Sequence, residues 1–138
     1  GNVIKPAGAE RAVGIITAGY RKDWTDPRWH DDPGMLEWLA FMQAYLPGAD
    51  LSDSNYTQAY AYGVTAMQVL RQCEEDFSRE NVMRQAANLK NLAVPVLLPD
   101  IVVNTSPTNY HPIRQMQLER WTGEAWQLFG EVISSADT

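Results

Sequence analysis

Cysteine is almost absent from this sequence of 138 residues, in which only Cys73 is present. A single cysteine cannot form a disulfide within the chain, so a disulfide-stabilised scaffold is excluded. Because Cys73 follows an apolar helical pattern, we expect a small buried side chain rather than a nucleophile. No run reaches the roughly eighteen apolar residues of a membrane span. The sequence shows neither an initiator methionine nor a signal peptide, and we expect a processed product or part of a longer protein.

Basic side chains are few and scattered. The sequence has 11 lysines and arginines against 17 aspartates and glutamates, which gives a net charge of −6. A nucleic-acid partner is excluded on this basis, because no basic patch is available to neutralise phosphates. With 45% apolar and 20% charged residues, the composition is typical of a soluble globular domain.

Sequence motifs for catalysis are also lacking. Neither a G-x-S-x-G nucleophile motif nor a glycine-rich phosphate loop is present. His30 to Asp32 and His111 are the only places where a metal site or a general base could be assembled, and the helical spacing of metal ligands is missing there. We therefore predict no enzyme, no metal and no cofactor. An enzyme built around His30 or His111 is the weakest alternative.

The central element is a predicted helix from Asp53 to about Cys73. Its apolar and aromatic positions recur at steps of three and four, the period of one helix face: Tyr56, Tyr60, Gly63, Met67 and Leu70. We expect this face to pack. The helix opens on polar residues that can accept hydrogen bonds from its first turn. Its N-terminus, at Asn55 and Tyr56, could also hold an anionic group.

Two further helices are predicted. Asp32 followed by Pro33 is a strong helix start, and the helix from 35 to 46 that follows is apolar on almost all sides. Such a helix normally packs against other elements on more than one side. We therefore expect that this chain does not contain every surface against which the helix packs. Ser78 is predicted to cap a shorter helix over 79–89.

The remaining segments indicate strands and loops. Residues 13–18 predict a buried strand, and 101–103 a short one. The loop 20–32 carries Trp24 and Trp29, which should fold back onto a neighbouring element. Residues 113–121 and 125–129 predict a β-hairpin, followed by a frayed tail over 130–138 with at most one extended stretch at Val132–Ile133.

Several stretches together resemble a known family. They are GIITAGYRKDWTDPRW, DDPGMLEWLAFMQAYLPGAD, YAYGVTAMQVLRQC, SRENVMRQAANL and LLPDIVVNTSPTNYHPIRQMQLERWTGEAWQLFGEVI. The sequence is similar to type I periplasmic solute-binding proteins, the receptors of ABC importers of the branched-chain amino acid type. The resemblance covers nearly the whole chain but only the last third or so of such a protein.

The resemblance implies an incomplete type I periplasmic-binding-protein fold of class α/β. It would have about three helices, short strands and a C-terminal β-hairpin. Family members have two lobes joined by a hinge, with the ligand between them. Residues 1–138 would then be a C-terminal fragment, with about 1–20 and 91–138 in the second lobe and hinge and about 21–90 in the first lobe.

The same resemblance implies a function. The chain would belong to a periplasmic receptor that binds a branched-chain or related amino acid, or an aromatic carboxylate, and delivers it to an ABC permease. Asn55, Tyr56 and Tyr20 are the ligand-binding residues that it indicates. The alternative is a ligand-sensing module of the same fold that signals to a membrane partner. Because the strand at 13–18 and the helix at 35–46 would lack cover, we also expect dimerisation or exchange of elements.

Overall fold

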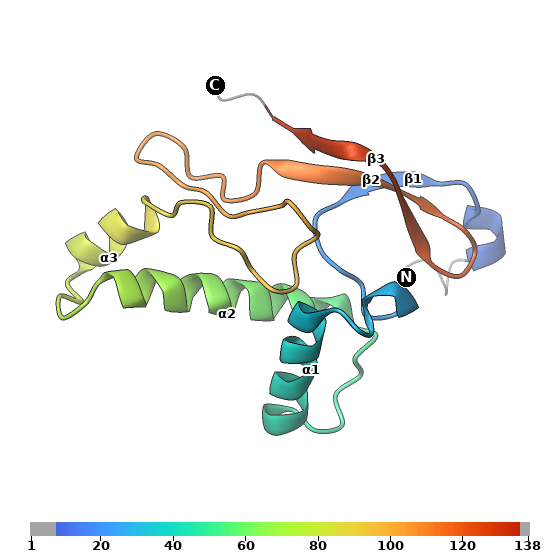
Figure 1. Cartoon of the computed structure of the whole chain (residues 1–138), viewed down its shortest axis with the longest axis horizontal. Helices are drawn as coiled ribbons and strands as arrows, with labels where there is room; N and C mark the ends of the chain where they lie inside the picture. Colours follow the sequence, from blue (N-terminus) through green and yellow to red (C-terminus); the bar gives the residue numbers. More distant parts are fainter. Residues whose placement is uncertain (1–7, 136–138) are drawn as a thin grey trace.

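The computed structural model describes residues 8–135 and shows an α/β arrangement. A three-stranded antiparallel sheet lies at one end of the molecule and the helices extend from it toward the other (Figure 1). The helices and strands follow the chain as η2 (Ala9–Ala12), β1 (Ile16–Gly19), η3 (Pro27–Trp29), α1 (Pro33–Tyr45), α2 (Ser54–Gln72), α3 (Arg79–Ala86), β2 (Gln115–Trp121) and β3 (Trp126–Ser134). The predicted class and the three predicted helices are confirmed.

Each of the three α-helices begins within about two residues of its predicted start. The side chains of Asp32, Asp53 and Ser78 each accept a hydrogen bond from a backbone N–H two or three residues further on. This bond satisfies one of the donors that a first helical turn leaves without an internal partner. Proline at the first position of α1 costs no helical hydrogen bond, because an N–H at that position would have had no partner within the helix.

The C-terminal hairpin forms as predicted and is longer than expected. β2 pairs with both β1 and β3, so the strand order is β1-β2-β3. A register shift between Met116 and Leu118 interrupts the pairing with β3. β3 nevertheless continues to Ser134. The prediction of a frayed tail from Gly130 onward is therefore wrong for residues 130–134. Residues 136–138 lie outside the described range.

The strand predicted over 13–18 forms as β1, but the prediction that it is buried is wrong. The strand lies at an edge of the sheet, and Ile16 is 51% exposed. A run of β-branched apolar residues indicates a strand, but its burial depends on whether another element covers its faces. No helix within residues 8–135 covers β1.

Residues 101–103 do not form the predicted strand. A single bridge between Leu92 and Val103 is the only ladder contact there. The segment 92–103 instead forms irregular backbone, because prolines at 95 and 99 prevent a regular ladder. It supplies a large part of the core, with buried side chains at Val94, Val96, Leu97, Leu98, Ile101 and Val103.

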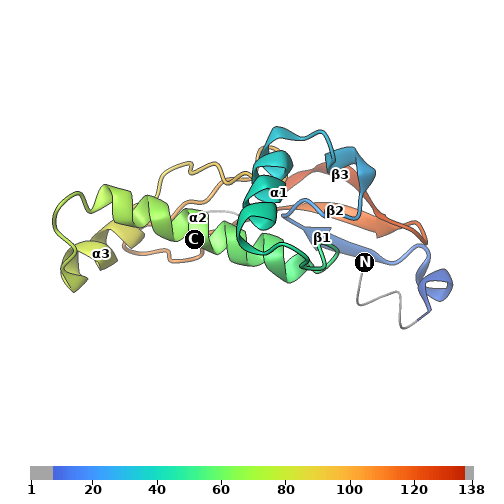
Figure 2. The ribbon, with the colours of Figure 1, turned by 90° about the horizontal axis from the view of Figure 1, so that it is seen from below.

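The core lies between this segment and the two longer helices. α1 runs across the direction of α2 near the N-terminal end of α2, and both lie to one side of the sheet (Figures 1 and 2). α1 contributes Met35, Trp38 and Met42 to the core. Trp24 contacts Trp38 with ring centroids 5.8 Å apart, which confirms that the loop 20–32 folds back onto a helix. No helix within residues 8–135 is long and apolar enough to cross a membrane.

The face on which α2 packs agrees only in part with the predicted one, since Tyr56 and Tyr60 pack against the core. Thr57, Ala61 and Val69 are its buried residues, whereas Met67 is 50% and Leu70 40% exposed. Both faces have helical spacing, so periodicity alone could not choose between them. Cys73 at the end of α2 is buried, as predicted.

Candidate functional site

Two chain segments lie side by side where the sheet meets the helices. Lys22 N donates to the carbonyl oxygen of Val96 at 2.9 Å, and Leu98 N donates to that of Tyr20 at 3.0 Å. An antiparallel bridge joins the residues between them, Arg21 and Leu97. We call residues 20–22 and 96–98 the crossing segments, because both connect the sheet to the helical part of the molecule.

The buried side chain of Lys22 fixes the crossing segments to α1. Lys22 is only 8% exposed. Its Nζ donates to Asp32 Oδ1 at 2.7 Å and to the carbonyl oxygen of Pro95 at 2.9 Å. Burial alone would raise the pKa of Asp32, but the hydrogen bonds from Lys22 and from the Met35 N–H outweigh it and lower the pKa below its ordinary value. A buried ion pair of this kind constrains geometry, since removing one partner leaves the other charge uncompensated.

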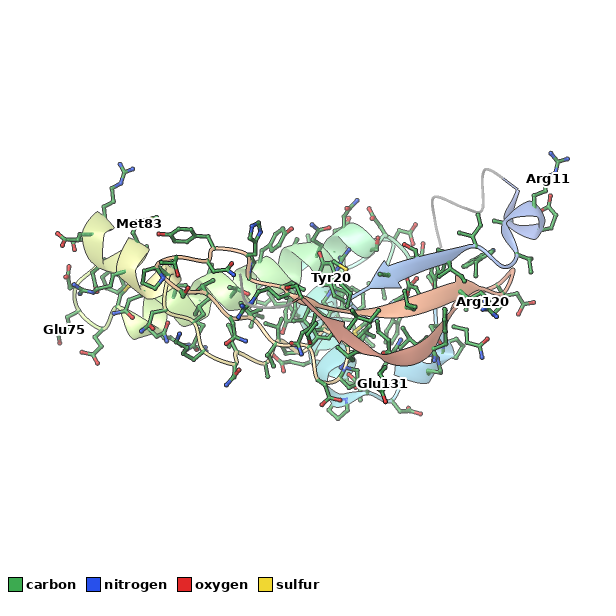
Figure 3. The ribbon with its side chains drawn as sticks, turned by 90° about the horizontal axis from the view of Figure 1, so that it is seen from above. Arg11, Tyr20, Glu75, Met83, Arg120 and Glu131 are labelled. Atoms are coloured by element: carbon green, nitrogen blue, oxygen red, sulfur yellow. The ribbon has the colours of Figure 1, made fainter. Side chains whose placement is uncertain are left out.

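A polar cavity of about 220 Å³ lies beside the crossing segments, between the end of β1 and the first turn of α2. Tyr20 lies at this junction, between the sheet and α2 (Figure 3). Side chains from the sheet, the crossing segment and α2 line the cavity, among them Tyr20, Arg21, Thr57, Glu119 and Trp126. Groups distant in the sequence thus converge on one polar space.

Arg21 ties the crossing segment to the first turn of α2. Its Nη1 donates to the carbonyl oxygen of Ser54 at 2.8 Å and lies 3.4 Å from Thr57 Oγ1. The Thr57 hydroxyl also donates to the Ser54 carbonyl at 2.9 Å. The guanidinium carbon lies 5.4 Å from the centroid of the Tyr20 ring. The positive charge of Arg21 is therefore held at one wall of the cavity.

Two carboxylates, those of Asp23 and Glu119, also line the cavity. Burial, and then the negative charge of Asp23, raise the pKa of Glu119, an effect that Arg28 opposes. Arg28 itself pairs with Asp26, with Nε donating to Oδ2 at 2.8 Å. Burial would raise the pKa of Asp26, but the hydrogen bonds and charge of Arg28 outweigh it and lower that pKa. The cavity therefore contains charges of both signs.

A second cavity, of about 470 Å³, lies between α1 and α2 and is mainly apolar. It is an open groove lined by part of the predicted packing face of α2, including Tyr56, Tyr60 and Met67. Tyr60 donates its hydroxyl to Glu37 Oε1 at 2.8 Å. Burial, and then Glu37, raise the pKa of Tyr60 to about 12. The groove is thus mainly apolar, with the carboxylate of Glu37 and the guanidinium of Arg71 among its lining groups.

The three predicted ligand-binding residues do not share a cavity. Tyr20 lines the polar cavity and Tyr56 the apolar groove. Asn55 is exposed, and its backbone N–H is occupied by Asp53 Oδ1 at 2.9 Å. Arg21 and Glu119 were not predicted, because neither lies in a local motif. Arg21 follows Tyr20 in the sequence, whereas Glu119 becomes a neighbour of Tyr20 only through tertiary structure.

The histidines occupy different environments. His30 Nε2 lies 3.0 Å from the carbonyl oxygen of Trp24, and its ring lies 4.5 Å from the Trp24 ring. His111 is exposed on the loop before β2. Within residues 8–135, no group of three or more histidine, cysteine, aspartate or glutamate side chains is arranged to hold a metal ion.

Comparison with known proteins shows a likeness in fold. The structure is similar to the crystal structure of a branched chain amino acid ABC transporter from Thermus thermophilus with bound valine, with a TM-score of 0.75 and 20% sequence identity. The match covers 98% of this chain and 37% of that chain. No family model and no curated protein sequence matches. The chain thus has the fold of part of that protein, which confirms the predicted fold class.

Proposed function

We propose that this chain is part of an extracytoplasmic solute receptor of an ABC importer and is not an enzyme. The observation that carries the proposal is the likeness in fold over 98% of the chain to a branched chain amino acid ABC transporter with bound valine. The fold alone does not define a ligand, so the proposed ligand class remains broad. It comprises branched-chain and related amino acids and aromatic carboxylates.

The crossing segments support this proposal. Residues of about 1–20 and 91–138 would form one lobe and hinge, and about 21–90 part of the other lobe. The polar cavity lies where these parts meet, next to the crossing segments. Bending there would bring the lobes together around a solute and exclude water, as in hinge closure.

Tyr20, Asn55 and Tyr56 remain the proposed solute contacts. Tyr20 already lines the polar cavity, and Asn55 and Tyr56 lie in the first turn of α2 next to Ser54. Replacing Asn55 with alanine, or Tyr20 or Tyr56 with phenylalanine, is expected to weaken solute binding without a large loss of stability, because Asn55 is exposed and the two rings keep their packing against the core. Isothermal titration with the solute that binds measures the effect.

A panel of solutes tests the receptor function. The full-length gene product should gain thermal stability with at least one amino acid or aromatic carboxylate, since a ligand at about a hundred times its Kd adds roughly 2.7 kcal/mol. No stabilisation by any member of the panel would refute the proposal. The receptor would act in the periplasm with a membrane permease. Neighbouring genes for a permease and an ATPase favour import, whereas a neighbouring sensor gene favours the signalling alternative.

Self-association through the apolar groove is proposed separately. Glu37 and Arg71 both line the groove. Glu37 contacts α2 at Tyr60, and Arg71 follows Tyr60 by about three turns of the same helix. Two copies packed groove to groove in opposite directions would bring each Glu37 near the other copy's Arg71. Sedimentation should show a dimer that Met67→Lys weakens. A monodisperse monomer at high concentration would refute this.

A further inference from the structure

A second polar pocket, of about 240 Å³, lies apart from the polar cavity. It is formed by residues of the segment 91–104 together with residues around the start of β2 and the end of β3, two strand ends that lie side by side (Figure 1). No residue of α1, α2 or α3 lines it, and it shares no lining residue with the polar cavity. We call it the amide pocket. Its polar lining residues are Asn91, Asn104, Arg114, Gln115, Ser134 and Ser135.

The oxygen atoms of two side-chain amides in this pocket are already in use. Asn104 Oδ1 accepts from the backbone N–H of Asn91 at 2.8 Å, and Gln115 Oε1 accepts from that of Val102 at 3.2 Å. A backbone N–H can only donate, so each amide must turn its oxygen toward that N–H and its NH₂ group away from it. Neither NH₂ group donates to another residue in the range 8–135. The two amides therefore have unused donors, whereas their oxygens are engaged.

The other polar groups of the amide pocket are also donors. Arg114 contributes a guanidinium, whose several N–H groups can serve more than one acceptor at once. The hydroxyl groups of Ser134 and Ser135 can donate as well. None of the residues that line the pocket is an aspartate or a glutamate, although the protein has a net charge of −6. Such a set of groups is suited to an anion rather than to a cation or a neutral sugar.

The arrangement of the donors favours a tetrahedral oxyanion. The guanidinium, the two NH₂ groups and the two hydroxyls belong to separate parts of the chain, which reach the pocket from different sides. A carboxylate accepts hydrogen bonds mainly in its own plane, whereas phosphate and sulfate carry oxygens in all directions. The negative net charge of the protein opposes its approach to an anionic membrane surface, so a soluble ion is favoured over a lipid head group.

We propose that the amide pocket binds a soluble tetrahedral oxyanion, phosphate or sulfate, through Arg114, Asn104 and Gln115. The pocket does not adjoin the crossing segments, and the proposal does not depend on the receptor function. The ion would join the segment 91–104 to the ends of β2 and β3 by charged hydrogen bonds.

Two nearly isosteric variants test the pocket. Asn104→Asp and Gln115→Glu each keep an oxygen for the backbone N–H and replace the NH₂ donor with a second carboxylate oxygen. The full-length gene product is titrated with phosphate, sulfate and acetate in a calorimeter, at an ionic strength held constant with chloride. Phosphate and sulfate should bind at least about tenfold more tightly than acetate. Each variant should weaken both by roughly tenfold or more, the worth of one charged hydrogen bond.

Gln127→Glu is the matched control. It makes the same change at an exposed position at the opposite end of β3 from Ser134, outside the pocket lining, and should leave the affinities unchanged. Wild-type thermal stability without ligand confirms that each variant folds. If one of the two pocket variants is unstable, the other decides the test.

Four results would overturn the proposal. The first is the absence of binding by phosphate and sulfate. The second is binding that both pocket variants leave unchanged or that the control weakens equally, since the ions would then bind elsewhere or respond only to overall charge. The third is acetate binding as tight as that of phosphate, which refutes a tetrahedral ligand. The fourth is sedimentation with vesicles that contain phosphatidic acid when free phosphate does not bind, which assigns the pocket to a lipid head group. None of these results bears on the receptor function.

Discussion

Replacing Gly34 with alanine tests how α1 is packed against the segment 92–103. Gly34 lies in the first turn of α1, directly against Pro95. A Cβ added at Gly34 would lie 2.3 Å from the carbonyl oxygen of Pro95 and 2.9 Å from its carbonyl carbon. Both atoms belong to backbone, so no side-chain rotation can relieve the contact. α1 and the segment would have to move apart.

The expected loss follows from what that movement disturbs. Overpacking a core contact costs about 1–3 kcal/mol. The same Pro95 carbonyl accepts the hydrogen bond from Lys22 Nζ, and weakening a charged bond of this kind adds up to about 1.5–3 kcal/mol. The better helix propensity of alanine returns at most about 1 kcal/mol. We therefore expect Gly34→Ala to lower the free energy of unfolding by about 2–4 kcal/mol.

Urea unfolding followed by tryptophan fluorescence measures this loss, because Trp38 is fully buried in the core that α1 forms. Gly63→Ala in α2 is the matched control. A Cβ at Gly63 meets nothing within 4 Å, so the same substitution should raise stability by about 0.5–1 kcal/mol. Equal effects of the two substitutions, or a stable Gly34→Ala, would refute the close approach of α1 to Pro95.

Other predictions concern pH, a buried amide and the thiol. Asp26 and Asp32 have folded-state pKa values below their ordinary 3.8. Their contribution to stability is therefore fully present above that value and lost as pH falls through the lower folded-state values, and replacing both with asparagine should flatten the acid limb of a urea–pH series. Asn81 donates its buried amide to the carbonyls of Cys73 and Asp76. Asn81→Ala should cost about 1–3 kcal/mol in urea unfolding, whereas Asn88→Ala, at an exposed position, should change little. Cys73 should react with a thiol reagent only as fast as the protein opens; rapid reaction in the folded state would contradict its burial.

Features set by neighbouring residues were predictable from the sequence. The start of α1 depends on Asp32 and Pro33 alone, since a cap acts over two or three residues. The hairpin was predictable for the same reason, because its two strands are joined by a short turn. Its continuation to Ser134 was not, because the number of paired residues depends on the partner strand rather than on local propensity.

Burial and the composition of the cavity were not predictable. Ala61 and Val69 of α2 belong to the same core cluster as the segment 92–103, which is irregular and shows no periodicity. The contact of Arg21 with Thr57 joins residues 36 apart, and the contact of Lys22 with Pro95 joins residues 73 apart. Tyr20, which the resemblance indicated as a ligand-binding residue, lines a cavity, and its contact with a solute stays a prediction. Glu119 carried no signal in the sequence, since an acidic residue in an alternating strand pattern is ordinary.

The order of the strands determines when the sheet can form during folding. β2 and β3 are joined by a short turn and can pair as soon as both leave the unfolded state, whereas β1 pairs with a strand about a hundred residues away along the chain. Closing so large a loop is slow, and α2 and α3 can form before it closes. β1 should thus join the sheet last. Until then, the backbone N–H and C=O groups of β1 and of the facing edge of β2 are unpaired, and this is the stage at which the chain is most prone to aggregate.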